Sequence, residues 1–159
     1  MSKVLESRFH CVTGLDPAAD SLTATAVTDV INATNAKAVH FIIHKGVGAT
    51  GTSTVTVEAC DNVTPSNTTA IPFIYQLCSA TGTSDVMGAI TKATTAGFTT
   101  AVGSGQIYMI TVDTDQLAPS GRKYVRLKAV ETTDSAQLAG IIVLIESQYP
   151  RAIHATAIA

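Results

Sequence analysis

The chain has 159 residues, of which 46% are hydrophobic and 14% charged, with a formal net charge of −2 and a pI near 6.0. This length favours a single domain that spans residues 1–159, and the slightly acidic balance excludes the basic footprint of a nucleic-acid-binding protein. About a quarter of the residues of a soluble chain are usually charged, so the low share here favours an exterior that a partner partly covers. The sequence holds no apolar run that would suit a transmembrane helix or a signal peptide, which predicts synthesis in a cytoplasm and no membrane partner.

Strand patterns dominate the first part of the chain. Residues 4–12 suit an arm or an edge strand, and 16–20 read as a turn. Residues 22–31 contain β-branched side chains with some alternation, and 38–44 form an apolar strand. Residues 53–60 alternate between apolar side chains and threonine or glutamate, which predicts a strand with two different faces.

The middle of the chain continues this pattern with loops between the strands. Residues 61–69 form a polar loop, and 71–79 predict a strand in which Pro72 indicates an edge position or a strand start. Threonine and small residues at 85–100 favour one or two short strands over a helix. Residues 106–113 again predict a strand.

The clearest pattern occupies residues 123–145. Its first half, 123–130, alternates strictly, which predicts a half-buried strand, whereas 141–145 is apolar on both parities, which predicts a strand covered on both sides. The turn residues 131–135 between them indicate a hairpin. With its regular turn signals and no convincing long helix, the chain is predicted to be all-β, an antiparallel β-sandwich of jelly-roll or Ig-like type with about seven to nine strands.

Two patterns suggest a cofactor or a metal ion, but their spacing argues against both. Residues 46–51 match GxGxxG, yet a β pattern follows at once, and the crossover helix of a dinucleotide-binding unit would need about ten residues there. A glycine loop in a hairpin is therefore expected, with no cofactor. His40 and His44 share one strand face about 13 Å apart, which is too far to bind the same metal ion with bonds near 2 Å.

Other residues that could bind a metal ion or take part in catalysis also lack the partner residues that such a site needs. Asp113 and Asp115 resemble the start of a calcium loop, but the glycine and glutamate that complete such a loop are missing. No GxSxG motif and no pair of carboxylates in an apolar setting occurs. We therefore predict no catalytic residues, no metal site and no enzymatic activity. Buried thiols are expected for the cysteines, with a disulfide between Cys60 and Cys78 left open.

The remaining prediction from the residues is a function in binding other proteins. Tyr124, Arg126 and Lys128 share one strand face, which is either a solvated surface or a docking face for an acidic partner. The apolar residues near the two ends, such as Phe9 and Ile153, belong either to frayed termini or to segments that pair with the sheet edge of a neighbouring subunit.

The end of the chain resembles a known family. The run 121–130, the polar turn, the apolar run 139–145 and the closing Gln148-Tyr-Pro-Arg151 are similar to the C-terminal half of small tailed-phage head proteins, the auxiliary capsid proteins called decoration or cement proteins. The size, the abundance of threonine, alanine and glycine, and the few charges fit the same family.

The resemblance implies a structural virion protein made in the host cytoplasm that binds the outside of an icosahedral shell. Its partner would be the major capsid protein, and it would form dimers or trimers. A phage tail or neck subunit and a carbohydrate-binding β-sandwich are the alternatives. The segments 1–12 and 148–159 are candidate extended arms, and the candidate interface residues are Phe9, Tyr124, Arg126, Lys128, Tyr149, Arg151 and Ile153.

Overall fold

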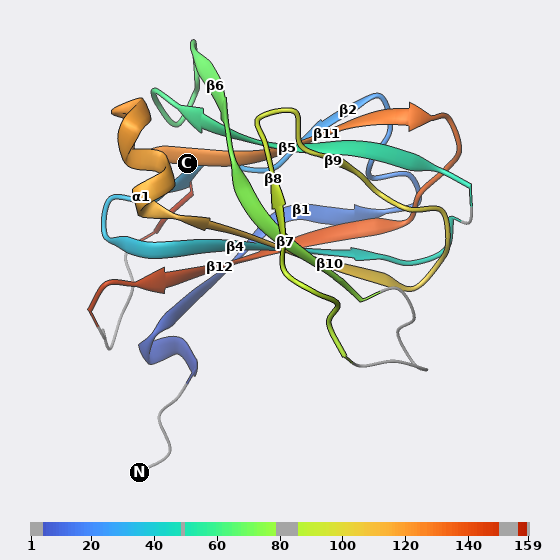
Figure 1. Cartoon of the computed structure of the whole chain (residues 1–159), viewed down its shortest axis with the longest axis horizontal. Coiled ribbons are helices and arrows are strands. Elements are labelled where there is room, and N and C mark those ends of the chain that lie inside the picture. The colour runs from blue at the N-terminus through green and yellow to red at the C-terminus, as the bar shows by residue number, and fades with distance from the viewer. Residues whose placement is uncertain (1–4, 49, 79–85, 150–155, 159) are drawn as a thin grey trace.

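Figure 1 shows the computed structural model of the chain, which describes residues 5–48, 50–78, 86–149 and 156–158. Two antiparallel sheets pack against each other around one hydrophobic core, so the predicted β-sandwich is confirmed. Within the described ranges the chain forms twelve strands, more than the prediction because one expected strand is divided and several are only two or three residues long.

Six strands form the first sheet. In spatial order they are β1 (Phe9–Ala18), β12 (Ala139–Ser147), β4 (Ala36–Lys45), β10 (Gln106–Asp113), β7 (Phe73–Cys78) and β8 (Thr91–Ala93). The second sheet has the order β2 (Thr25–Val27), β11 (Tyr124–Thr133), β5 (Thr52–Cys60) and β6 (Thr68–Ile71), with β3 (Ile31–Asn32) paired to β11 and β9 (Phe98–Thr99) paired to β5. The short helical pieces are η1 (Leu5–Ser7), α1 (Thr114–Leu117) and η2 (Ala118–Ser120).

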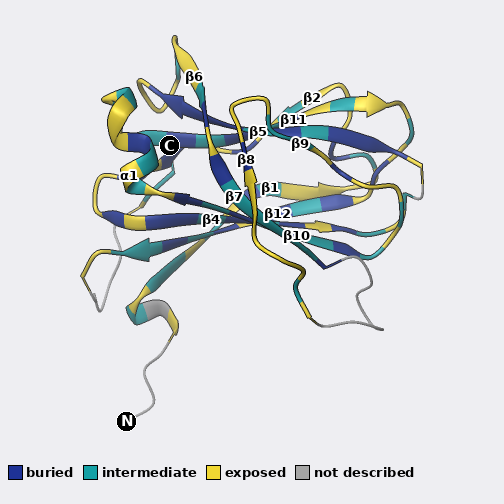
Figure 2. Ribbon diagram, viewed as in Figure 1, coloured by how far each residue is buried: buried dark blue, intermediate teal, exposed yellow. Residues whose placement is uncertain are grey.

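The core lies between the two sheets and follows from the alternation of the strands. Phe41 and Tyr108 of the first sheet and Val57 and Leu127 of the second are almost completely buried. Each such side chain stabilises the fold by about 1.5–3 kcal/mol relative to an exposed position. Figure 2 shows buried positions as dark blue bands that alternate along several strands with partly or fully exposed positions.

The predicted hairpin within residues 123–145 is wrong. β11 belongs to the second sheet and β12 to the first, so the chain crosses between the layers at residues 134–138. Gln137 is fully buried at this crossing, and its backbone N–H donates a hydrogen bond to the Asp20 carboxylate at 3.0 Å. A period of two fixes which side chains share a face, but it does not fix which strand lies alongside.

The prediction that 141–145 is covered on both sides is also wrong. Ile141, Val143 and Ile145 are buried against the second sheet, whereas Leu144 is partly exposed and Ile142 is 51% exposed. The second sheet covers only one face of the first. The apolar side chains on the other face of this sheet therefore lie on the surface of the molecule.

Two other predictions, a strand at 71–79 and a hairpin loop at 46–51, also differ from the structure. The strand expected at 71–79 breaks at Pro72 into β6 in the second sheet and β7 in the first, because proline cannot donate to a ladder and the chain changes sheet there. The loop at 46–51 likewise connects β4 to β5 across the layers, so it is not a hairpin. β5 begins directly at Thr52, so a strand and not a helix follows this loop.

Candidate functional site: the outer faces of the two sheets

The outer face of the first sheet is apolar at its centre. Met109 on β10, Ile42 on β4 and Ile142 on β12 are aligned neighbours across three strands, because Ile42 pairs with both of the others. All three are partly or largely exposed. With the adjacent outward residues they form what we call the apolar face, which comprises Ile42, Ile107, Met109, Ile142 and Leu144.

A groove of about 440 Å³ continues the apolar face at one end. Leu15 and Pro17 of β1 form one wall, and Leu138 and Ile142 form the other. The register of β1 with β12 shifts on both sides of Leu15, so the edge strand bulges at this point. Leu138 is 40% exposed at the rim, and the groove can therefore accept an apolar side chain from outside.

The two histidines of β4 flank Ile42 on this face. The Nδ1 atom of His40 lies 2.9 Å from the Thr111 hydroxyl, and its ring lies 6.1 Å from that of Phe9. Burial lowers the pKa of His40, an effect that the nearby carboxylates of Glu146 and Asp113 oppose. His44 is exposed and lines the groove. Along the residues that the structure describes, no three His, Cys, Asp or Glu side chains gather as metal ligands would.

Charge occurs at the border of the apolar face, next to Phe9. Glu146 accepts from Arg8 at 3.0 Å and from Lys37 at 3.4 Å. The Arg8 side chain is still 58% exposed, whereas that of Glu146 is 13% exposed. One nearly buried carboxylate is thus shared by two cations, so Lys37 can satisfy Glu146 without Arg8.

The outer face of the second sheet is polar. Arg126 and Lys128 project from β11 beside Glu58 of β5, with ion-pair distances of 2.7 Å and 3.4 Å. The Glu58 side chain is only 10% exposed. The basic stripe that the sequence predicts is therefore largely neutralised within the chain, and Lys128, about one-third exposed, is its more accessible cation. Tyr124 is partly exposed on the same face.

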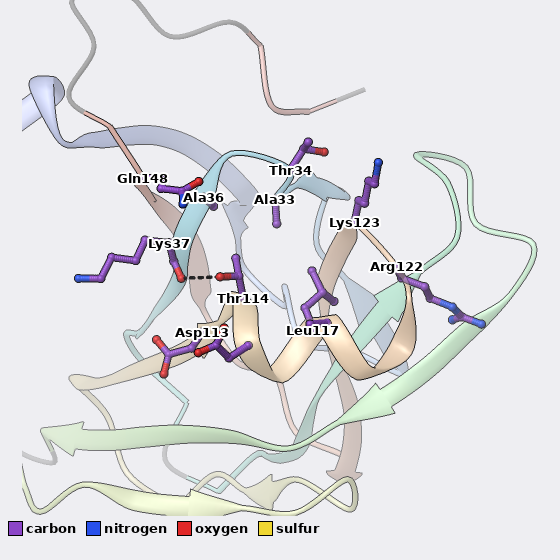
Figure 3. A pocket seen from close by; sticks show the side chains of 12 residues that line it. Ala33, Thr34, Ala36, Lys37, Asp113, Thr114, Leu117, Arg122, Lys123 and Gln148 are labelled. Carbon is purple, nitrogen blue, oxygen red and sulfur yellow. Dashed lines mark hydrogen bonds between the residues drawn. The ribbon is translucent and has the colours of Figure 1, made fainter.

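A second hollow has a volume of about 650 Å³ and lies between the start of β4, α1 and the residues after η2. Its lining side chains are drawn in Figure 3. Its basic side chains do not converge, since Lys37, Arg122 and Lys123 point in three different directions. The Thr114 hydroxyl donates to the Lys37 carbonyl at 3.2 Å, and the Arg122 guanidinium donates to the Ala59 carbonyl at 2.6 Å. These contacts stabilise the local structure, and the basic side chains around the hollow do not point to a common position where a ligand would bind.

A buried lysine was missed by the prediction from sequence. Lys45 is 1% exposed and donates to the carbonyls of Gly51 at 2.7 Å and Ala101 at 3.0 Å. Burial lowers its pKa. The signal was present, because Lys45 continues the inward parity of Phe41 and Ile43, but its charge argued for a surface position. The residue fastens two connecting loops to the end of β4.

The predicted interface residues do not gather on one surface. Phe9 lies on the outer side of the first sheet, and Tyr124, Arg126 and Lys128 lie on the opposite side of the molecule. Tyr149 is 66% exposed just after β12. Arg151 and Ile153 lie outside the described residues.

The other predictions have simple outcomes. Cys60 and Cys78 are buried as expected, lie in different sheets and form no disulfide, whereas Cys11 is exposed, so the expectation of a buried thiol is wrong for Cys11. Burial raises the pKa of Cys60. Asp113 directly precedes α1, and its backbone N–H donates a hydrogen bond to the Gln116 side chain at 3.0 Å. None of the described helices has the length and the apolar character that a membrane crossing requires.

Comparisons with known proteins add one distant likeness. No protein-family model matches the chain, and no curated protein matches it. Among solved structures, the chain is similar to the SPBc2 prophage-derived protein YomS, with 14% sequence identity and a TM-score of 0.43 over 85% of this chain and 92% of that one. This neighbour is a prophage-derived protein, and a likeness this weak has no bearing on the function of the present chain.

Proposed function

We propose that this chain is a structural protein of a tailed-phage particle that binds the outer surface of the capsid and stabilises the shell. The observation that carries the contact with the shell is the cluster of Arg126 and Lys128 around the single carboxylate of Glu58. The uncovered apolar face adds that the chain associates with other protein, since a soluble monomer usually keeps such patches small. A sandwich with this surface is suited to work inside an assembly. The resemblance of residues 121–151 to decoration proteins supports the capsid as that assembly.

The physical effect of such binding is straightforward. A protein that binds only the assembled shell stabilises it by mass action, by about 2.7 kcal/mol per site when its free concentration is 100 times its Kd. Many equivalent sites add their contributions. A rigid sandwich also loses little conformational entropy when it docks.

The polar face of the second sheet is the candidate contact with the shell. Arg126 and Lys128 outnumber the single carboxylate of Glu58, so the cluster retains one positive charge. Tyr124 adds an amphipathic ring of a type that is enriched at protein interfaces. This face would meet an acidic region of the capsid surface.

The experiment is co-sedimentation of the purified chain with expanded capsids that were assembled without it. We expect saturable binding and a higher disruption temperature of the decorated shells. Lys128→Ala is expected to weaken binding, whereas Lys92→Ala, at an exposed residue of β8 in the other sheet, serves as the matched control. If the chain stays in the supernatant at micromolar concentrations with every capsid preparation, the proposal is wrong.

The main aromatic cluster of the described residues does not suit a carbohydrate-binding module. Such modules present exposed aromatic rings, but Tyr75 and Phe98 stack at 4.0 Å between the sheets and contact Phe73 and Tyr108 there. A tail or neck position would share the same architecture. Labelled protein that covers the whole capsid would exclude that alternative.

A further inference from the structure

We propose that a second copy of this chain covers the apolar face, in a two-fold dimer in which Phe9 of each copy occupies the groove of the other. The two-fold axis runs across the strands, in the plane between the copies, close to Ile142 and Leu144. The inference does not depend on the capsid as a partner, because the dimer would form in solution.

The first reason is the distribution of polarity. The aligned residues Met109, Ile42 and Ile142 form a continuous apolar row across the centre of the sheet. In the described part of this face, charged side chains occur at the borders and not within the row. A surface of this kind is best matched by another apolar surface, and an identical copy supplies one whenever the protein is concentrated.

The second reason is shape, because a partly exposed aromatic ring and a groove lie at opposite ends of the same face. Phe9 pairs with Glu146 at one end of the β1–β12 ladder, and the groove beside Leu15 lies at the other, about 20 Å away. A two-fold axis across the strands exchanges the two ends. It therefore places each Phe9 over the partner's groove, and the contact occurs twice, as isologous symmetry requires.

The third reason is charge. The same rotation brings Arg8, which precedes Phe9, next to Asp16, which lines the groove. Asp16 is exposed and forms no ion pair with another described residue. Arg8 can turn toward it because Lys37 also binds Glu146. Each copy thus offers a cation at one end and a carboxylate at the other, in positions that the dimer would bring together.

The test is sedimentation equilibrium of the full chain without capsids. We expect a concentration-dependent dimer that Ile142→Asp disrupts. Because that change could also affect folding, the decisive variants are at exposed charges. Arg8→Asp and Asp16→Arg should each raise the dimer Kd about tenfold, and the double variant should restore it. Asp134→Arg, at an exposed residue outside this face, should leave the Kd unchanged.

Cross-linking provides an independent readout with the native sequence. Cys11 lies on the outer side of β1 between Phe9 and Thr13 and is exposed, whereas Cys60 and Cys78 are buried. The proposed axis brings the two Cys11 thiols near each other, so a short bis-maleimide should produce a covalent dimer. A chain that remains monomeric up to about 1 mM, the limit of a weak interface, would overturn the inference. So would a double charge variant that is no better than either single one.

Discussion

At the scale of single residues, Glu58 organises the outer face of the second sheet. Its carboxylate is one-tenth exposed and binds both Arg126 and Lys128. The two cations that suggested a docking face from the sequence therefore also have a structural role. Removing the carboxylate leaves both cations half-buried without a partner.

We accordingly expect Glu58→Gln to lower the free energy of unfolding by about 1–3 kcal/mol, below the full cost for a deeply buried pair because the cations are partly solvated. Urea denaturation at neutral pH measures the change. The loss should shrink in an Arg126→Gln background, since one interaction is then already absent. Asp134→Asn, at an exposed position, is the control, and an equal effect of both changes would contradict the structural role.

Two glycines with similar backbone angles differ in the space around them. Gly97 has φ +75° and Gly121 has φ +68°, both in the left-handed region. A Cβ on Gly97 would overlap the Val55 carbonyl oxygen, whereas a Cβ on Gly121 would meet no atom within 4 Å. Only the first position therefore combines backbone strain with a collision.

Gly121→Ala should cost about 1 kcal/mol from the left-handed conformation alone. Gly97→Ala should cost about 2–4 kcal/mol, because β5 must also shift away from the new methyl group. Thermal or urea unfolding of the two variants provides the comparison. Equal losses would show that the contact of Gly97 with β5 is not as close as described.

His40, which lies beside the apolar face, predicts that the stability of the fold depends on pH. Burial lowers the pKa of His40 below its ordinary value of 6.5, so the folded chain binds this proton less readily than the unfolded chain. Stability must then fall as the pH drops from 6.5 toward the lower folded-state pKa, and it is unaffected by this group above that window. Unfolding free energies measured between neutral and mildly acidic pH should show a smaller slope for His40→Asn than for the natural chain. Identical slopes would contradict this contribution.

At the scale of the elements, the C-terminal residues 156–158 pack against the core of the same chain. The Asn32 backbone N–H donates to the Ala157 carbonyl at 2.8 Å, and Ala157 and Ile158 pack against the buried cluster. The sequence left open whether the apolar tail frays or pairs with a neighbouring subunit. For residues 156–158 the structure shows a third arrangement, an intramolecular contact beside β3.

This contact predicts a loss of stability when the tail is altered. Ile158→Ser should lower the free energy of unfolding by about 1 kcal/mol, as expected for a half-buried aliphatic side chain. Ile90→Ser, at a position that is 64% exposed, should change it by less than about 0.5 kcal/mol. Chemical denaturation compares the two, and a tail variant as stable as its control would argue against the intramolecular packing.

Most of the individual strands could be predicted from the sequence, but their neighbours in the sheets could not. The strands at 38–44, 53–60 and 106–113 are confirmed, because runs of β-branched and aromatic residues, and at 53–60 a strict alternation, are local signals. The change of sheet at Pro72 and the separation of β11 from β12 depend on which strand lies alongside, and that information is not local. Lys45 lies one residue beyond the strand expected at 38–44, and a charged side chain is usually exposed, so its burial was not predicted.

The candidate site was only partly predictable for a related reason. Phe9 was singled out from its apolar neighbours, and the doubly apolar run 141–145 was noticed but assigned to the interior. Ile42, Met109 and Ile142 come from three strands that are far apart in the sequence. Their alignment depends on the sheet order, so the apolar face could be recognised only in the folded chain.

At the scale of the whole molecule, the sandwich has two outer surfaces of different chemistry. The first sheet presents the apolar face, and the second presents threonines with the ion cluster around Glu58. One surface is suited to self-association and the other to a polar partner. A dimer built on the apolar face would leave two copies of the polar face free to contact an assembled shell.

The most direct measurement is an electron cryomicroscopy map of expanded capsids saturated with the purified chain. The proposed function predicts β-sandwich density on the exterior of the shell, repeated at equivalent lattice positions. Bare capsids, or density confined to the tail or neck of the particle, would contradict it.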